Sequence, residues 1–373
     1  MKKLISNLKK EERVILDLRK LYENYGYKKI KLNKFEEYEF YNNNKDFFKT
    51  ENILTFTDLN GRLQALRPDV TLSVVKKVSK DNKQGTKKLY YIENVYRVSK
   101  ETREYEELEQ LGVELIGSVD EYSNLEIIDM AIESLKSINK NYILDISHLG
   151  FVSDLLEEMN LDYNSKNKVL KNIHLKNSHD LERLLDDEKV ELKYKECLLK
   201  IAKLSGNYKE VLEKAKKLAL NEKMENSLKE LQALSSIFDF HDIEDKVLLD
   251  FSIVNNLDYY NGIIFQGYIE NNSKVILSGG RYDKLAERFT EKKKAIGFAI
   301  FLDELDKFNK KEYDFDILIL YKNGEYPVLL DMVKKLIEKN HTVRTERYDK
   351  NNYVDFRYKE KYIFDNNELK REE

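Results

Sequence analysis

Apolar positions recur at helical spacing twice in the N-terminal part of the chain. Between residues 11 and 26 they repeat every three or four positions, as at Val14 and Leu18, and Gly26 is a typical helix stop. Residues 121–138 repeat the pattern. We therefore predict two amphipathic helices, each with one apolar side that packs against a core.

Alternating or continuous apolar runs predict strands elsewhere. Asn60-Gly61 between two such runs indicates a hairpin, because both turn positions tolerate positive φ. Pro68 predicts the start of a further helix, since proline presets φ there. Gly279-Gly280 predicts a turn after a strand. The predicted strands are residues 29–32, 53–57, 63–66, 89–98, 105–116, 247–254, 262–269, 274–277 and 295–300.

The pattern changes in two later parts of the chain. Residues 151–246 carry Leu, Lys and Glu at helical spacing and almost no strand signal, so we predict an all-helical insertion. The pattern of residues 311–373 predicts a strand, a helix, a second strand and a further strand. The sequence thus predicts an α+β fold in which residues 1–310 form a large domain and residues 311–373 a small α/β appendage.

Charge and cysteine content exclude several classes of protein. Lys+Arg 65 nearly balances Asp+Glu 68, giving a net charge of −3 and no overall basic surface for nucleic acid. Cys197 is the only cysteine, so neither an intrachain disulfide nor a thiolate metal cluster can form. The N-terminus has no apolar signal region, and no run reaches membrane-spanning length. We expect a cytoplasmic protein without a cofactor or metal.

Several carboxyl and amide side chains suit the ammonium group of a free amino acid. Asp69 lies at the start of a predicted helix, and Glu114 lies within a predicted strand, with Gln110 on the same face of that strand. Taken singly, Asp69 is an ordinary first-turn carboxylate and Glu114 a solvated strand position. Their combination favours a ligand site.

Three tyrosines provide a second wall for such a site. Tyr259 and Tyr260 follow Leu257-Asp258, and Tyr282 follows Gly279-Gly280-Arg281. Aromatic faces and a phenol hydroxyl suit a flat heterocycle such as imidazole. Tyrosine is abundant in this chain, with 25 residues, so each tyrosine by itself is more simply read as packing.

Six segments follow one another along residues 10–310: Leu66–Thr71, Tyr96-Arg97, Gln110–Glu114, Leu257–Tyr260, Gly279–Asp283 and Gly297–Ala299. Together and in this order they resemble the motifs of class II histidyl-tRNA synthetases. The resemblance implies an antiparallel sheet of about six strands flanked by helices, and a dimer built through residues 11–41. It also implies a histidine pocket formed by Asp69, Thr71, Arg97, Gln110, Glu114, Tyr259, Tyr260 and Tyr282. The appendage then resembles a shortened anticodon-binding domain.

Three positions depart from the synthetase pattern where that family handles ATP. Ser99 stands in place of a glutamate that helps to bind ATP, and Asn255 and Glu304 each stand in place of an arginine. Replacing a phosphate-binding arginine with a carboxylate reverses the sign of its interaction with a polyanion. The loss of such electrostatic groups costs several kcal/mol of transition-state stabilisation each. We therefore expect no catalytic residues and no adenylation.

A chain that retains the histidine pocket but lacks the groups that bind ATP resembles the regulatory subunits of ATP phosphoribosyltransferase. That resemblance implies a hetero-oligomer with a short catalytic subunit, in the first step of histidine biosynthesis, with L-histidine as the effector. Histidine could bind the kept pocket or an interface between subunits. The alternatives are a histidyl-tRNA synthetase and a synthetase-like module that binds histidine or tRNA.

Overall fold

The structure is a computed structural model that divides into two compact units, Met1–Phe308 and Asn309–Glu373. We describe each unit by itself. The described residues are 10–45, 47, 53–81, 85–99, 102–254, 259–290, 293–306, 313–349 and 356–372.

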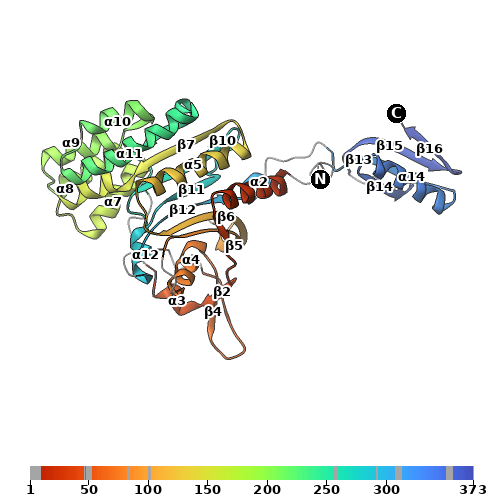
Figure 1. The fold of residues 1–373 in the computed structure, drawn as a ribbon, viewed down its shortest axis with the longest axis horizontal. Helices are drawn as coiled ribbons and strands as arrows, with labels where there is room; N and C mark the ends of the chain where they lie inside the picture. The colour runs from red at the N-terminus through yellow and green to blue at the C-terminus, as the bar shows by residue number, and fades with distance from the viewer. Residues whose placement is uncertain are drawn as a thin grey trace. The chain divides into compact units, whose positions relative to one another are not determined.

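A nine-stranded sheet forms the centre of the first unit (Figure 1). Its middle six strands, from β5 to β7 in spatial order, are antiparallel, as the resemblance implies. β1 joins β5 in parallel at one side, and β9 joins β7 in parallel at the other. In spatial order the strands are β1 (Lys28–Lys29), β5 (Lys87–Val98), β6 (Tyr105–Gly117), β12 (Lys294–Phe301), β11 (Leu277–Arg281), β10 (Ile263–Ile269), β7 (Tyr142–His148), β9 (Val247–Asp250) and β8 (Ser205–Asn207).

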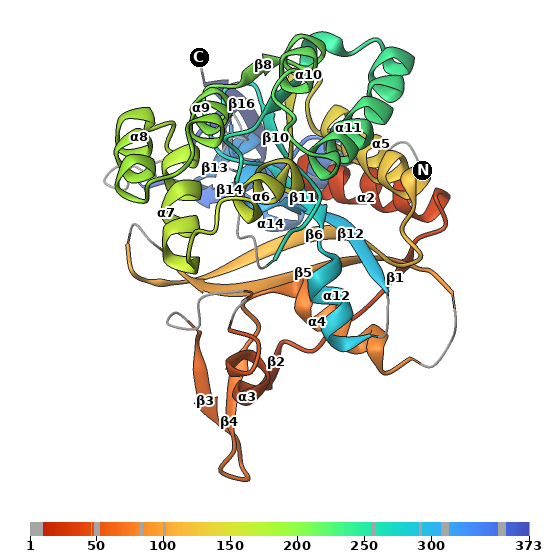
Figure 2. The same ribbon diagram turned by 90° about the vertical axis from the view of Figure 1, so that its left-hand side faces the viewer.

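Helices cover both faces of this sheet (Figure 2). On one face α2 (Lys10–Asn24) packs on α5 (Glu121–Ile138), burying Val14, Leu18 and Tyr22 in the larger core cluster. The predicted helices at these two positions are confirmed. On the other face α4 (Val70–Ser79) and α12 (Asp283–Phe289) contact each other and bury a second cluster. The longer helices α2 and α5 therefore cover one face of the sheet, and the shorter helices α4 and α12 cover the other.

A small three-stranded sheet precedes α4. The hairpin predicted at Asn60-Gly61 is confirmed by antiparallel pairing of β3 (Thr55–Thr57) with β4 (Leu63–Leu66). β2 (Phe35–Glu37) pairs with the other edge of β4 and is followed by the short helix α3 (Tyr38–Asn42).

Arg67 fixes this small sheet and the start of α4 to the large sheet. Its side chain is fully buried and donates to the carbonyl oxygens of Asn33 and Asn94 and to the carboxylate of Glu93. A buried guanidinium must find such acceptors, since an unpaired buried charge is costly. Asp69, two residues later, is thereby held at a set position relative to β5.

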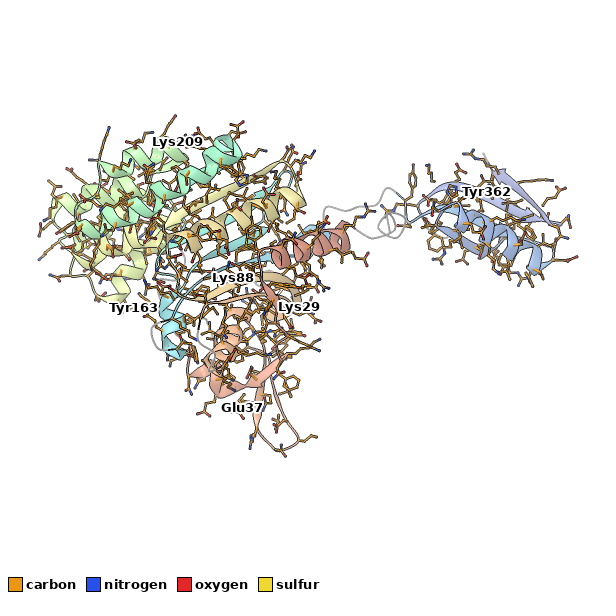
Figure 3. All side chains as sticks on the ribbon, in the orientation of Figure 1. Lys29, Glu37, Lys88, Tyr163, Lys209 and Tyr362 are labelled. Carbon is orange, nitrogen blue, oxygen red and sulfur yellow. The ribbon has the colours of Figure 1, made fainter. Side chains whose placement is uncertain are left out.

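Residues 151–246 are mainly helical but not all-helical. Six α-helices and the short 3-10 helix Glu244–Lys246 make up the insertion, and Lys209 and Tyr163 lie on its outer surface (Figure 3). The exception is β8, whose Ser205–Asn207 pair with β9 and extend the large sheet. Three residues around Gly206 carry no alternating apolar signal, so the sequence did not indicate a strand. The α-helices are α6 (Leu149–Glu157), α7 (Tyr163–His174), α8 (Ser178–Asp187), α9 (Leu192–Ile201), α10 (Tyr208–Lys216) and α11 (Glu222–His241).

Gly279-Gly280 does not form the predicted turn. Both glycines lie inside β11, paired with β10 and β12. A Cβ on Gly280 would lie 2.8 Å from the carbonyl oxygen of Ile263, so these positions need glycine for close strand approach. The predicted strand at 274–277 is therefore displaced toward the C-terminus, to Leu277–Arg281.

The second unit is a four-stranded sheet with one helix. Ile317, Ile319, Leu329 and Phe364 form its buried centre. Helix α14 (Tyr326–Glu338) has Pro327 in its first turn. The strands, in spatial order, are β14 (Val343–Arg347), β13 (Phe315–Tyr321), β15 (Tyr358–Asp365) and β16 (Glu368–Glu372), of which the last was not predicted. Across the described residues of both units, every helix is too short or too polar to cross a membrane.

Candidate functional site

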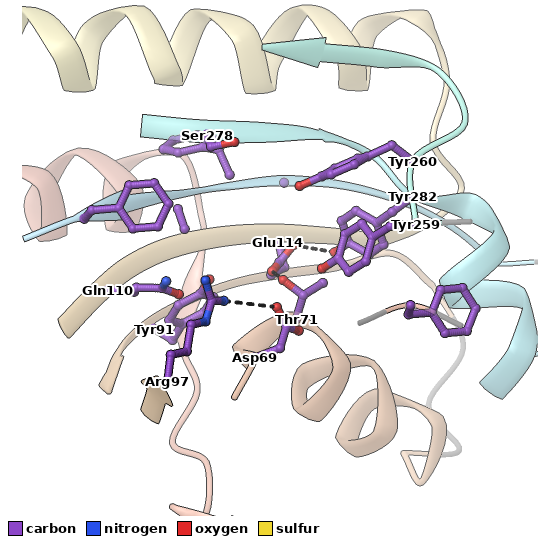
Figure 4. A pocket seen from close by; sticks show the side chains of 15 residues that line it. Asp69, Thr71, Tyr91, Arg97, Gln110, Glu114, Tyr259, Tyr260, Ser278 and Tyr282 are labelled. Carbon is purple, nitrogen blue, oxygen red and sulfur yellow. Dashed lines mark hydrogen bonds and ion pairs between the residues drawn. The ribbon is translucent and has the colours of Figure 1, made fainter. Parts of the chain in front are cut away.

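A pocket of ≈ 580 Å³ opens on the α4 and α12 face of the large sheet (Figure 4). All eight residues that the sequence singled out lie around it, although they come from five separate parts of the chain. They are Asp69, Thr71, Arg97, Gln110, Glu114, Tyr259, Tyr260 and Tyr282.

Glu114 on β6 is the deepest charged group of the pocket. It is only 2% exposed, and its two carboxylate oxygens accept hydrogen bonds from the hydroxyls of Thr71, at 2.8 Å, and Tyr282. Burial raises the pKa of Glu114 to about 8, and the two hydroxyl donors only partly offset this. At neutral pH this carboxyl therefore favours its protonated form.

Asp69 and Arg97 form a pair of opposite charges nearer the pocket opening. Asp69 is the N-cap of α4, where its Oδ1 accepts from the backbone N–H of Leu72 at 2.9 Å, as the simpler reading of the sequence had it. Its Oδ2 lies 4.0 Å from the guanidinium of Arg97, whose Nε donates to the carbonyl oxygen of Pro68 at 2.9 Å. Burial raises the pKa of Asp69 from its ordinary value. The cap role leaves one oxygen directed toward Arg97.

The tyrosines form one aromatic wall at the other side of the pocket (Figure 4). The ring centroids of Tyr259 and Tyr260 lie 4.6 Å apart, and those of Tyr259 and Tyr282 lie 6.1 Å apart. Asp283, which follows Tyr282, holds the segment after Tyr260 in place. Its carboxylate accepts from the amide group of Asn261 at 3.2 Å and from the backbone N–H of Ala295 at 3.0 Å. The wall is thus preorganised by polar contacts outside the pocket.

Seven further residues line the pocket that the sequence did not single out as site residues, although Gly297–Ala299 belong to one of the six motif segments. Glycine, alanine and serine carry little chemical signal, and the aromatic residues fitted ordinary packing. Strand pairing places Gly297 and Ala299 at the pocket, because Gly297 is paired with Glu114 and Ala299 with Gly112. The missed residues are Phe47, Tyr91, Ser278, Gly297, Phe298, Ala299 and Phe301.

Two of the three departures from the synthetase pattern lie among the described residues, and neither lines the pocket. Ser99 follows β5, where its hydroxyl accepts from the backbone N–H of Thr102 at 3.4 Å. Glu304 lies in α13 (Asp303–Asp306), with a carboxylate oxygen 3.5 Å from the ammonium of Lys274. Asn255 lies outside the described residues. Arg97 is therefore the single arginine or lysine lining the pocket in the described part of the chain.

The described residues contain no group of three or more histidine, cysteine, aspartate or glutamate side chains that could hold a metal ion. The pocket therefore offers hydrogen bonds, one cation and two carboxyl groups to a ligand. Such a set suits a small zwitterion with a flat polar ring.

The comparisons with known sequences converge on one family. The profile of the family described as histidyl-tRNA synthetase matches residues 3–305. A curated ATP phosphoribosyltransferase regulatory subunit from Clostridium kluyveri is 32% identical over 359 residues, covering 93% of this chain and 91% of the relative. A histidine–tRNA ligase from Methanococcus maripaludis is 33% identical over 315 residues, covering 81% and 73%.

Solved structures show the same fold. A protein from Bacillus halodurans, described as an ATP phosphoribosyltransferase regulatory subunit/histidyl-tRNA synthetase, matches with a TM-score of 0.74 at 23% identity, covering 93% of this chain and 90% of that one. A chain of the ATP phosphoribosyl transferase (HisG:HisZ) complex from Thermotoga maritima matches with a TM-score of 0.62 at 22% identity, covering 78% and 96%. The chain belongs to the ATP phosphoribosyltransferase regulatory subunits, which share the fold of the histidyl-tRNA synthetase family.

Proposed function

We propose that this chain is a non-catalytic regulatory subunit that binds L-histidine in the pocket around Glu114 and transmits its presence to a short catalytic ATP phosphoribosyltransferase subunit. The observation that carries the proposal is the convergence of all eight candidate residues on one pocket that has only one lining cation among the described residues. Feedback requires differential binding of the effector to two states of an assembly. A polar pocket on a chain other than the catalytic subunit can supply the effector site that such coupling needs.

The arrangement of charges supports one orientation of the ligand. The sequence led us to expect the ammonium group at Glu114. Asp69 and Arg97, with charged groups 4.0 Å apart, match the opposite charges of an amino-acid head group, and Glu114 lies beside the tyrosine wall. We therefore favour the head group between Asp69 and Arg97 and the imidazole N–H at Glu114. The reverse orientation, with the ammonium at Glu114, is the alternative.

Feedback by histidine in the reconstituted complex tests the proposed function. Mixing the full chain with a short catalytic subunit from the same genome should give a stable complex that has phosphoribosyltransferase activity and is inhibited by L-histidine. Asp69→Asn in the same complex should shift the inhibition curve to higher histidine concentration. Activity and feedback of the catalytic subunit alone, unaltered by this chain, would contradict the proposal.

The isolated chain should not catalyse histidine-dependent exchange of pyrophosphate into ATP. Adenylation brings a triphosphate next to the bound amino acid, and the described pocket lining offers Arg97 alone as a cation. The assay is isotope exchange with purified chain, with a reaction lacking histidine as its blank. Exchange well above that blank would favour the second candidate, a histidyl-tRNA synthetase, which is the name carried by some of the similar proteins.

The chain should be at least a dimer in solution. Helix α2 buries Val14 and Leu18 against its own core, yet leaves Leu16 48% exposed, and Phe35 of β2 is 53% exposed. Both side chains lie within residues 11–41, through which the resembled family is expected to dimerise. Light scattering at micromolar concentration measures the mass directly. A monodisperse monomer of 44.4 kDa would be the contrary result. We place this assembly in the cytoplasm.

A further inference from the structure

The floor of the pocket is a short trough across three paired strands. Because directly paired residues of antiparallel strands point to the same face, partners of the lining residues Glu114 and Gln110 also face the pocket. Three successive rows result, each two residues further along the strands. From the tyrosine side they are Glu114 with Gly297 and Gly280, then Gly112 with Ala299 and Ser278, then Gln110 with Phe301.

The side chains of these rows give the trough a closed end. In the middle row Ala299 and Ser278 are small, whereas Tyr91 of β5, which is paired with Gly112, places its ring over that glycine. In the third row the large aromatic ring of Phe301 is part of the pocket lining. Rows lie about 6.6 Å apart, at about 3.3 Å per residue. Between the Glu114 row and the row that contains Phe301, the trough is therefore open for the length of one row only, over Ala299 and Ser278.

The polar groups place the carboxyl end of a bound amino acid toward Phe301. Arg97 and Gln110 lie together on the side of Glu114 away from Tyr259, Tyr260 and Tyr282 (Figure 4). A ligand that sets its ring against the tyrosines and its carboxylate near Arg97 points that carboxylate along the trough, toward the row of Gln110 and Phe301.

We propose that Phe301 limits the length of the ligand, so that the pocket accepts a free amino acid and rejects derivatives extended at the carboxyl group. This inference rests on the proposed histidine site and adds its specificity-determining residue. An aromatic side chain fits this task, because it has few rotamers and its displacement would disturb the packing around β12. Gly297 and Ala299, the preceding residues on this face, impose no such limit.

Calorimetry with two ligands that differ only in length tests the inference. L-Histidine amide and L-histidine benzylamide both lack the carboxylate charge, so the ratio of their affinities reports length alone. The full chain should bind the benzylamide at least about tenfold more weakly than the amide, a difference of about 1.4 kcal/mol. Phe301→Ala should reduce this ratio to less than about threefold, and Phe301→Leu should give an intermediate ratio.

Phe56→Ala is the matched control, because Phe56 is a partly exposed phenylalanine on β3 that does not line the pocket. It should keep the ratio of the unaltered chain. Equal binding of both ligands by the unaltered chain, or an unchanged ratio in both Phe301 variants with histidine binding retained, would overturn the inference alone. Failure of the unaltered chain to bind L-histidine would instead count against the proposed histidine site.

Discussion

Gly297→Ala is expected to destabilise the large unit by about 3 kcal/mol or more, at the upper end of the cost of overpacking a core. A Cβ at this position would lie well inside contact distance of the Glu114 carboxylate and of the carbonyl oxygen of Val113 on the neighbouring strand. The carbonyl cannot move without separating β12 from β6, whose pairing carries the pocket floor. Urea denaturation followed by circular dichroism measures the loss.

Gly26→Ala is the matched control for this substitution. Gly26 has φ of +82° and no neighbour within 4 Å of an added Cβ, so alanine there meets only backbone strain. That strain costs about 1 to 2 kcal/mol. Equal losses for the two variants would show that the space at Gly297 is not the deciding factor.

Glu114→Gln is expected to weaken L-histidine binding by about 1.5 to 3 kcal/mol, the cost of a lost hydrogen bond to a charged group. In either ligand orientation an N–H donor of the ligand, from the imidazole or from the ammonium group, loses its carboxylate acceptor. Calorimetry on the full chain, alone and with the catalytic subunit, measures the change. Unchanged affinity and unchanged feedback would place the effector at an interface between subunits.

The same substitution should change how stability depends on pH. The carboxyl of Glu114 has a folded-state pKa of about 8 against an ordinary value of 4.5, because burial penalises its charged form. Between these values the folded state holds a proton that the unfolded state has released, so stability falls as pH rises. Glutamine cannot ionise. The decrease in the free energy of unfolding that Glu114 causes as pH rises, up to a few kcal/mol, should therefore be absent in the variant.

The free energy of unfolding at pH 5 and pH 8 checks this, in the unaltered chain and in both Glu114→Gln and Glu106→Gln. Glu106 is exposed on the same strand, so its replacement controls for the loss of a carboxyl group without burial. The prediction fails if Glu114→Gln and Glu106→Gln show the same difference between the two pH values.

Much of the fold followed from local patterns. The helices α2 and α5 were predicted because one-sided apolar spacing is a property of a short stretch of chain, and the β3–β4 hairpin because Asn60-Gly61 suits its turn. Where pairing with a neighbouring strand determines the secondary structure, the local sequence pattern predicted no strand or predicted a turn instead. Ser205–Asn207 form a strand through β9, and Gly279-Gly280 lie within a strand because neighbouring backbone approaches them closely.

The sequence by itself determined most of the polar residues that line the candidate pocket, since their motifs keep residue type and order together, though not Tyr91 and Ser278. Only the tertiary structure decided their physical state. Glu114 holds its proton near neutral pH because β6 lies in the middle of the sheet, under Thr71 and Tyr282, and burial of this kind depends on segments distant in sequence. The small floor at Gly297 and Ala299 and the large ring of Phe301 are likewise brought to the pocket by strand register, because pairing, and not local sequence, sets which residues share a face.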